Sequence, residues 1–265
     1  MPYSVPPLRT IHIDRYVLPL REGGSVPGLV TADDGLKYVI KFRGAAQGPK
    51  VLIAELIGGE LARALGLNMP ELVFAQLDEA YGRIEHDEEI QSQLKASTGL
   101  NLGVSYLDGA ITFDPAVTKI NADDASKILW LDSLITNVDR TARNTNMLIW
   151  NKQLWLIDHG ASLIFHYSWL YPPAEQALRP FPLIKNHVLL KAATRLAKAD
   201  KTARAVLSAD VVHNIVALIP DDWLADERFA TIAQHRYAYE TFLLTRIKNS
   251  AIFIKEAIHA REEAI

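Results

Sequence analysis

Residues 136–160 read TNVDRTARNTNMLIWNKQLWLIDHG, and this stretch carries the strongest structural signal in the chain. Within it, two short apolar runs flank the polar residues 151–153. Apolar runs separated by a few turn-forming residues are typical of a β-hairpin, here over 146–157. Because the second strand of a hairpin runs back beside the first, the pattern predicts that Asp158 lies close in space to Asn144.

A polar loop precedes the hairpin and follows a predicted helix over 122–136. In that loop, Asp139 and Asn144 are five residues apart. Asn144 and Asp158 would supply amide and carboxylate oxygens, which Mg²⁺ prefers and usually shares with substrate phosphates. Asp139 would then be free to accept a proton from an attacking hydroxyl. The spacing matches the template for phosphoryl transfer, and a polar loop with capping Asp and Asn side chains is the alternative.

Phosphoryl transfer on this template also requires a strand lysine and a carboxylate from the next helix. Residues 36–42, LKYVIKF, are β-branched and aromatic, which predicts a half-buried strand that carries Lys41. In the helical pattern that follows, Glu55 and Glu60 stand among apolar residues. Glu55 is favoured because it lies in the first turns, and a glutamate in such surroundings should have a partner. An exposed edge lysine and a solvated glutamate are the alternatives.

A glycine-rich loop lies upstream of that lysine. Gly23, Gly24 and Ser25 separate two predicted strands, 10–20 and 26–31. Backbone N–H groups of such a loop can hold phosphate oxygens. The alternative is a plain hairpin turn with no ligand.

The remaining pattern divides the chain into a β-rich part of roughly 110 residues and a helical part. A helix is predicted from Pro49 to a stop at Gly66, and Gly58 and Gly59 within it indicate close packing or a kink. After Pro182 the chain is nearly all helical. The other predicted elements are strands over 72–77 and 100–107, a short polar helix over 86–95, and helices over 206–218 and about 227–262.

One segment between the hairpin and these helices allows two interpretations. Residues 165–173 are rich in aromatic residues and proline. They would form either a loop that faces the substrate or a hydrophobic plug against the helices.

The chain resembles the HipA-like kinases, in particular the shorter members that keep mainly the kinase region. It is also similar to the phosphatidylinositol 3-/4-kinases, which carry a comparable Asp-Arg-x-x-x-Asn and Asp-x-Gly. The resemblance covers about residues 10–165. The matching residues are Gly23-Gly24-Ser25, Tyr38-Val39-Ile40-Lys41-Phe42, Glu55 with residues 61–67, Asn137-x-Asp139-Arg140-x-x-x-Asn144, and Ile157-Asp158-His159-Gly160.

This resemblance implies an α+β, bilobal protein-kinase-like fold. Residues 1–107 would form an N-lobe of antiparallel sheet plus one helix, and 108–265 a mainly helical C-lobe. It also implies ATP and Mg²⁺ as cofactors, with transfer of the γ-phosphoryl group to a hydroxyl. The chain departs from the protein-kinase pattern because it has no His-Arg-Asp and no Ala-Pro-Glu.

The resemblance also implies a role for each matching residue. The catalytic base would be Asp139, and the metal ligands would be Asn144 and Asp158. The nucleotide would be held by Gly23, Gly24, Ser25, Lys41 with its partner Glu55, and a hinge that includes Ser105 and Tyr106. A protein Ser or Thr is the expected acceptor. A small-molecule or lipid kinase is one alternative, and a nucleotide-binding pseudokinase or toxin-type interaction module is another.

Composition restricts the classes of reaction and of partner that the chain can have. The 265 residues include no cysteine, so thiol chemistry is excluded, and a net charge of -3 gives no footprint for nucleic acid. Residues 1–10 have no apolar signal core, and no apolar run approaches the roughly 18–20 residues of a membrane helix. We therefore expect a soluble, cytoplasmic protein whose partner is a protein or small-molecule hydroxyl substrate, without direct contact to nucleic acid or membrane. A regulatory protein is a further candidate partner.

Overall fold

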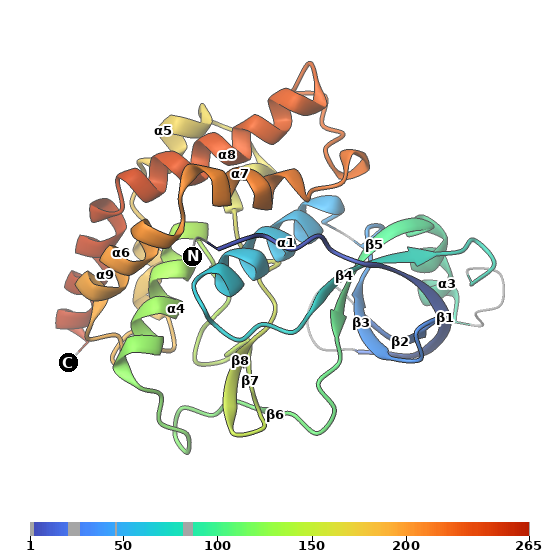
Figure 1. Cartoon of the computed structure of the whole chain (residues 1–265), viewed down its shortest axis with the longest axis horizontal. Coiled ribbons are helices and arrows are strands. Elements are labelled where there is room, and N and C mark those ends of the chain that lie inside the picture. The colour runs from blue at the N-terminus through green and yellow to red at the C-terminus, as the bar shows by residue number, and fades with distance from the viewer. Residues whose placement is uncertain (1–2, 21–26, 46, 82–86, 265) are drawn as a thin grey trace.

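The computed structural model describes residues 3–20, 27–45, 47–81 and 87–264. It is an α+β structure, with a barrel of strands at one end and a group of helices at the other (Figure 1). The strands of the barrel follow the order β1-β2-β3-β5-β4. Their bounds are β1 Thr10–Pro19, β2 Gly28–Ala32, β3 Lys37–Lys41, β4 Leu72–Leu77 and β5 Gly99–Ser105.

The barrel differs in one respect from the antiparallel sheet that was expected. Four of its pairings are antiparallel, but β1 pairs with β4 in parallel, through Thr10 opposite Phe74 and His12 opposite Gln76. A parallel pairing requires a long crossover, and the chain between β1 and β4 contains a full helix. The pattern of each strand alone could not reveal this closing contact.

Alternating side chains fill the inside of the barrel. In β3, Tyr38 and Ile40 are wholly buried, while Val39 and Lys41 between and beyond them are partly exposed. This is the period of two that a strand with one buried face must have. The turn before β3 is tight, and in it Gly35 adopts a left-handed φ of 76°.

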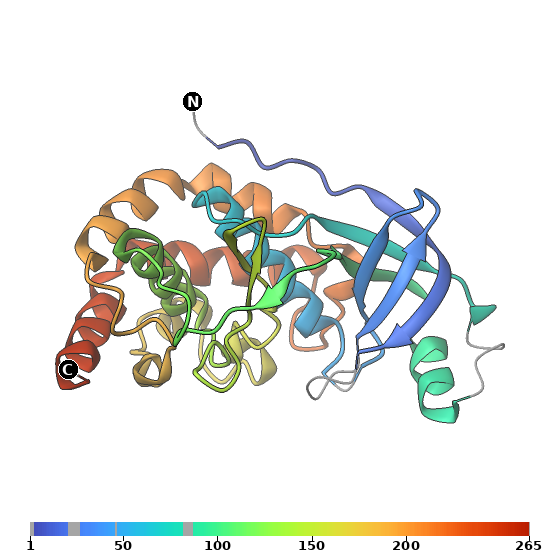
Figure 2. The ribbon, with the colours of Figure 1, turned by 90° about the horizontal axis from the view of Figure 1, so that it is seen from below.

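Helix α1 (Pro49–Ala64) connects the barrel to the helical part. It lies between them in both views (Figures 1 and 2) and packs against β5, α4 (Ala122–Ile135) and α7 (Ala209–Ala217). Its glycines mark close packing, as one of the two interpretations predicted. A Cβ at Gly58 would lie 2.6 Å from the Cβ of His159, and one at Gly59 would lie 2.8 Å from Leu72 Cδ1.

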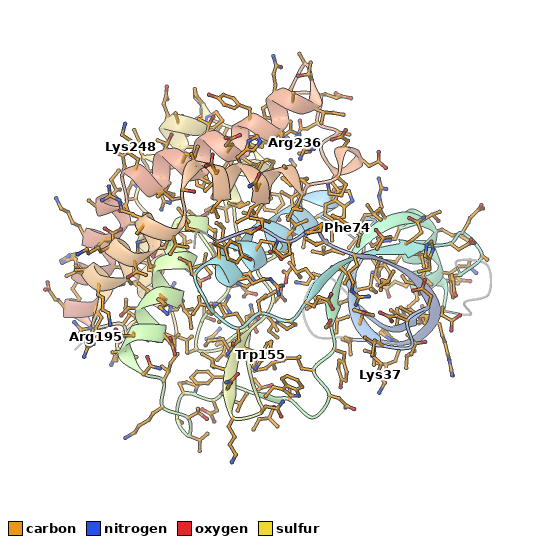
Figure 3. All side chains as sticks on the ribbon, in the orientation of Figure 1. Lys37, Phe74, Trp155, Arg195, Arg236 and Lys248 are labelled. Carbon is orange, nitrogen blue, oxygen red and sulfur yellow. The ribbon has the colours of Figure 1, made fainter. Side chains whose placement is uncertain are left out.

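A further contact joins the two parts directly. Phe74 of β4, labelled in Figure 3, packs edge-on against Trp223 of the short helix η3 (Asp221–Trp223). Their ring centroids are 5.8 Å apart. The Trp223 indole N–H donates to the carbonyl of Leu100 at 3.2 Å. The N-terminal part also holds a second helix, α3 (Glu88–Ala96), which confirms the short polar helix predicted from the sequence, whereas the resemblance implied a lobe with one helix.

The predicted hairpin is confirmed within a small second sheet. β7 (Met147–Trp150) and β8 (Gln153–Leu156) pair antiparallel, and β6 (Ile111–Thr112) adds to β7. Asn151 and Lys152 in the turn have φ of 49° and 62°. Two successive left-handed residues form the tight turn that matches the twist of a hairpin.

Helices make up most of the remaining chain. Their bounds are η1 Ile164–Tyr167, α5 Pro173–Ala177, η2 Pro182–Asn186, α6 Leu196–Val206, α8 Ile232–Lys248 and α9 Ala251–Glu263. The single helix expected over 227–262 is wrong, because α8 ends and α9 begins around Asn249. Asn249 leaves the helical conformation, with φ of −108° and ψ of 28°, and the Ser250 N–H donates to the carbonyl of Ile247, three residues back, rather than four. Within the described residues, no helix combines the length and the apolar character needed to cross a membrane.

The aromatic segment 165–173 is mainly a plug. Phe165 is buried and stacks on Phe242 of α8 at 3.9 Å between ring centroids. Trp169 packs against Tyr239 of the same helix at 5.4 Å. Leu170 at the end of this run is 77% exposed. The segment therefore anchors the chain after β8 onto the helices through Phe165 and Trp169, while Tyr167, Ser168 and residues 170–172 are exposed.

Candidate active site

Lys41 lies at the centre of a three-residue ionic cluster. β3 carries Lys41, and its Nζ donates to Glu55 Oε2 at 2.7 Å and to Asp158 Oδ1 at 2.5 Å. The glutamate side chain is wholly buried and the lysine nearly so, whereas the Asp158 side chain is 47% exposed. The structure thus brings together three residues predicted for the nucleotide site. Glu60, the other candidate partner, pairs instead with Arg63 at 3.3 Å.

The cluster remains charged. Burial lowers the pKa of Lys41, but the nearby Asp158 and Glu55 carboxylates outweigh burial and hold that pKa above its ordinary value. Burial raises the pKa of Glu55, and the lysine only partly offsets this. The lysine lowers the pKa of Asp158, so this carboxylate is negative at neutral pH. With two carboxylates around one ammonium, the more exposed acid is left available to a further cation.

The Asp-His-Gly sequence fits tightly against α1. The His159 backbone N–H donates to Glu55 Oε2 at 2.7 Å, so helix and motif share one carboxylate oxygen. A Cβ at Gly160 would lie 2.7 Å from Val51 Cγ1, which explains why glycine occupies this position. His159 itself is fully buried, and burial together with Arg140 lowers its pKa to about 3. A neutral imidazole packed on Gly58 indicates a structural role for this histidine.

The predicted catalytic loop presents Asp139 between two asparagines. Asp139 Oδ2 accepts hydrogen bonds from Asn144 Nδ2 at 2.8 Å and from Asn146 Nδ2 at 3.1 Å. The Asp139 backbone N–H donates to Asn137 Oδ1 at 3.0 Å. Sequence reasoning missed Asn146. The sequence signal for it is a second asparagine two residues after Asn144. In the structure Asn146 has a left-handed φ of 48°, which asparagine tolerates well.

A buried ion pair supports this loop from below. Arg140 Nε donates to Asp132 Oδ2 of α4 at 2.6 Å, and both side chains are fully buried. Arg140 Nη1 also donates to the carbonyls of Asn146 and Ile157. Burial alone would raise the pKa of Asp132, but Arg140 and His187 outweigh it and hold that pKa well below its usual range. One guanidinium therefore ties α4, the loop and the end of the hairpin together.

The hairpin returns the chain as predicted. The Ile157 N–H donates to the Asn146 carbonyl at 3.0 Å, which continues the β7–β8 ladder toward the loop. In this arrangement Asn144 is bonded to Asp139, while Asp158 is bonded to Lys41. A metal shared between Asn144 and Asp158 stays a prediction.

The other predicted nucleotide contacts are not tested. Gly23, Gly24 and Ser25 lie outside the described residues. At the end of β5, the Ser105 N–H donates to the Glu71 carbonyl at 2.9 Å, and the Tyr106 N–H donates to the Lys37 carbonyl at 3.0 Å. An adenine at this hinge would therefore have to use groups other than these two N–H donors.

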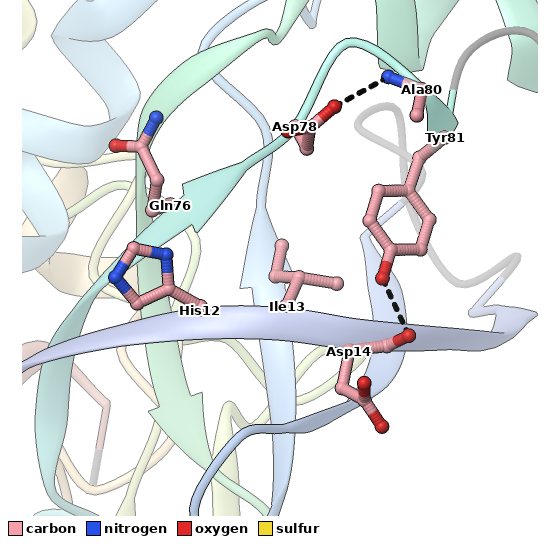
Figure 4. Close-up of a pocket in the computed structure, with 7 residues that line it drawn as sticks. All are labelled: His12, Ile13, Asp14, Gln76, Asp78, Ala80 and Tyr81. Carbon is pink, nitrogen blue, oxygen red and sulfur yellow. Dashed lines mark hydrogen bonds between the residues drawn. The ribbon is translucent and has the colours of Figure 1, made fainter.

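A separate pocket of ≈ 660 Å³ opens on the barrel where β1 and β4 diverge (Figure 4). Tyr81 lines it and donates through its hydroxyl to the Asp14 carbonyl at 2.5 Å. None of the predicted site residues that the structure describes lines this pocket. The Lys41 cluster and the Asp139 loop, rather than this pocket, are therefore the candidate active site.

Two solved kinase structures share this fold. The proinflammatory kinase CtkA of Helicobacter pylori aligns with a TM-score of 0.55 and 13% identity, over 97% of this chain and 99% of that one. A Golgi casein kinase with Mn and ADP bound aligns with a TM-score of 0.51 and 13% identity, over 96% of this chain and 74% of that one. At this identity the likeness concerns the fold. No curated protein matches the sequence.

The family is shown by the sequence itself. The model of the HipA-like kinases matches residues 13–253. That range includes the Lys41 cluster, the Asp139 loop and nearly all of the helical part. The chain belongs to the HipA-like kinase family.

Proposed function

We propose that this protein transfers the γ-phosphoryl group of ATP, in the presence of Mg²⁺, to a serine or threonine hydroxyl of a protein. The observation that carries the proposal is the pairing of Lys41 with Glu55 of α1 and with Asp158 beside the hairpin. Phosphoryl transfer needs little covalent chemistry from the enzyme, so positioning and charge neutralisation are sufficient. We take 1–107 as the nucleotide-covering lobe and 108–265 as the lobe that carries the catalytic loop.

Lys41 would bind the α- and β-phosphates. Its ammonium stays charged because two carboxylates raise its pKa. Glu55 fixes the direction of the ammonium from a wholly buried position. The lysine can therefore meet an incoming phosphate without first changing its own orientation, which is how a preorganised charge stabilises a transition state.

The donor set around Asp158 fits a magnesium ion. The ligands would be the carboxylate of Asp158, which is negative and half exposed, and the amide oxygen of Asn144, which is also exposed. Oxygen ligands from few residues, completed by waters and phosphates, are what Mg²⁺ usually takes. When bound, the ion would neutralise the charge that develops on the phosphate oxygens.

Asp139 would orient and deprotonate the acceptor hydroxyl. Two amide donors hold Oδ2 from Asn144 and Asn146, and among the described residues no donor reaches Oδ1. A carboxylate fixed on one side and open on the other is suited to receive a proton. A protein acceptor is favoured over an anionic lipid because a chain with net charge -3 offers no excess of cations for a membrane surface.

Incubation with labelled ATP, Mg²⁺ and fractionated lysate tests the proposal. We expect label on a protein band that is lost on chelation, and a roughly 10²–10⁴-fold slower transfer by Asp139→Ala with unchanged nucleotide binding. Label on a small molecule or lipid alone would assign a different acceptor. Binding of ATP without any transfer would show an interaction module and overturn the proposal, as would wild-type transfer by Asp139→Ala.

A further inference from the structure

His187 lies directly after η2 and is held on both ring nitrogens. Its side chain is almost entirely buried, and Nε2 lies 2.9 Å from Asp132 Oδ2. The Leu189 backbone N–H donates to Nδ1 at 3.0 Å. Because Nδ1 accepts a hydrogen bond, the proton of a neutral imidazole must be on Nε2, which therefore donates to Asp132. The surroundings thus select one tautomer of His187.

Asp132 transmits this contact to Asp139 by two routes. In the first, Asp132 Oδ1 accepts from Asn137 Nδ2 at 3.0 Å, and Asn137 Oδ1 accepts the Asp139 backbone N–H. In the second, Arg140 bonds both Asp132 Oδ2 and the Asn146 carbonyl, and the Asn146 side chain bonds the Asp139 carboxylate. The first route fixes the backbone of Asp139 and the second fixes its carboxylate.

The main chain places His187 beside the same loop. Thr141 and His187 form an isolated antiparallel bridge, and the Val188 N–H donates to the Arg140 carbonyl at 3.1 Å. The two segments therefore remain adjacent even if the imidazole is removed. A substitution at His187 can thus alter the Asp132 contact without separating the segments.

We propose that His187 is a positioning residue for Asp139, acting through Asp132. The inference rests on the proposed function and adds to it a residue that belongs to neither the Lys41 cluster nor the Asp139 loop. Asp132 Oδ2 is shared by the imidazole and the guanidinium of Arg140. Without the imidazole, this buried carboxylate and Arg140 would readjust, and the Asn146 carbonyl would move with them. A displacement of about 1 Å at a reacting group can slow a reaction by on the order of 10²-fold.

Three substitutions separate the two hydrogen bonds of the His187 imidazole, one to Asp132 and one from the Leu189 N–H. His187→Gln keeps an N–H donor at about the distance of Nε2. His187→Asn keeps an acceptor for the Leu189 N–H but cannot reach Asp132, and His187→Leu provides neither. We expect kcat to be close to wild type for the first variant and roughly tenfold to hundredfold lower for the other two. His259→Asn on α9, where the histidine is largely exposed, serves as the matched control and should keep wild-type kcat.

The KM for ATP distinguishes positioning from general destabilisation. Among the described residues, His187 has no hydrogen bond or ion pair with the Lys41 cluster. The KM for ATP should therefore stay within about twofold of wild type in every variant while kcat falls. Thermal unfolding gives the folded fraction at the assay temperature. The inference is overturned if His187→Asn retains wild-type kcat, or if kcat falls only in proportion to the folded fraction.

Measurements that do not require catalytic turnover test this inference separately from the proposed function. Amide hydrogen exchange at Asp139 N–H reports whether Asn137 still holds the loop, and imidazole ¹⁵N shifts in the wild-type protein report the His187 tautomer. We expect the Nε2–H tautomer, and faster exchange at Asp139 in His187→Asn than in His187→Gln. If the wild type transfers no phosphate but the exchange differs in this way, the proposed function fails and the positional link stands. Equal exchange in both variants would contradict the link itself.

Discussion

Lys41 Nζ lies 2.7 Å from Glu55 Oε2, so a barrel strand and helix α1 meet through an ion pair whose acidic partner is completely buried. The same Glu55 oxygen accepts the His159 backbone N–H at 2.7 Å. One oxygen atom of Glu55 therefore contacts both the strand that carries Lys41 and the Asp-His-Gly motif.

Substitution of Glu55 by glutamine should show how much the charge of this side chain contributes to the orientation of Lys41. The amide keeps the size of the side chain but removes its charge, and we expect kcat/KM for ATP to fall by about tenfold, which corresponds to roughly 1.4 kcal/mol. Steady-state kinetics with varied ATP would measure this. Glu60→Gln is the matched control, since Glu60 is also buried in α1 but pairs with Arg63 rather than Lys41, and it should retain wild-type kinetics.

Gly58→Ala should destabilise the fold. The added methyl would lie 2.6 Å from the His159 Cβ, next to the backbone of the Asp-His-Gly motif, and overpacking of this kind costs about 1–3 kcal/mol in free energy of unfolding. Urea denaturation gives the value. Gly59→Ala meets only side-chain ends of Leu72 and Met69 and should cost less. Equal stability of Gly58→Ala and wild type would show that α1 and the motif are not packed as closely as described.

Substitutions of the two asparagines that contact Asp139 should have different effects on the Mg²⁺ requirement. Asn146→Ala removes a donor to Asp139 and places alanine at a left-handed φ, so we expect about tenfold lower kcat with an unchanged Mg²⁺ requirement. Asn146→Gly relieves the backbone strain without restoring the donor and should show the same kcat. Asn144→Ala should in addition raise the Mg²⁺ concentration needed for half-maximal rate. A higher Mg²⁺ requirement in Asn146→Ala would instead assign the ligand role to Asn146.

His166 should make stability depend on pH. It is fully buried, and burial lowers its pKa to about 3 from an ordinary value of about 6.5. The unfolded chain therefore binds a proton that the folded protein does not, and stability falls as pH decreases from about 6.5 toward 3, by up to about 1.4 kcal/mol per pH unit from this group. Urea denaturation at pH 7, 6 and 5 should give a shallower decline for His166→Phe than for wild type. His259→Gln, which changes a largely exposed histidine, should leave the wild-type slope unaltered.

Local features of the site could be predicted from the sequence. The hairpin follows from two apolar runs around a short turn, and the five-residue spacing of Asp139 and Asn144 is contained in one loop. Lys41 and Glu55 were paired because a strand lysine and a helical carboxylate follow each other closely in the chain. Each of these inferences uses residues whose relation is set within one or two elements.

Relations over longer distances could not be predicted. His187 and Asp132 are 55 residues apart, and nothing in the sequence around either one indicates that their side chains meet. The parallel pairing of β1 with β4 likewise depends on how α1 crosses between them. The end of α8 at Asn249 could not be predicted because the apolar period continues across it, while the backbone of Asn249 leaves the helical conformation.

The parallel contact of β1 with β4 also constrains how the protein folds. β1 cannot complete the barrel until the chain has passed through α1, and α1 buries its surface mainly among helices that are synthesised later. Contacts between distant segments form slowly because the loop between them must be closed first. A fragment that ends at residue 107 would leave α1 without its cover, so barrel and helices should unfold together as one cooperative unit rather than as two independent ones.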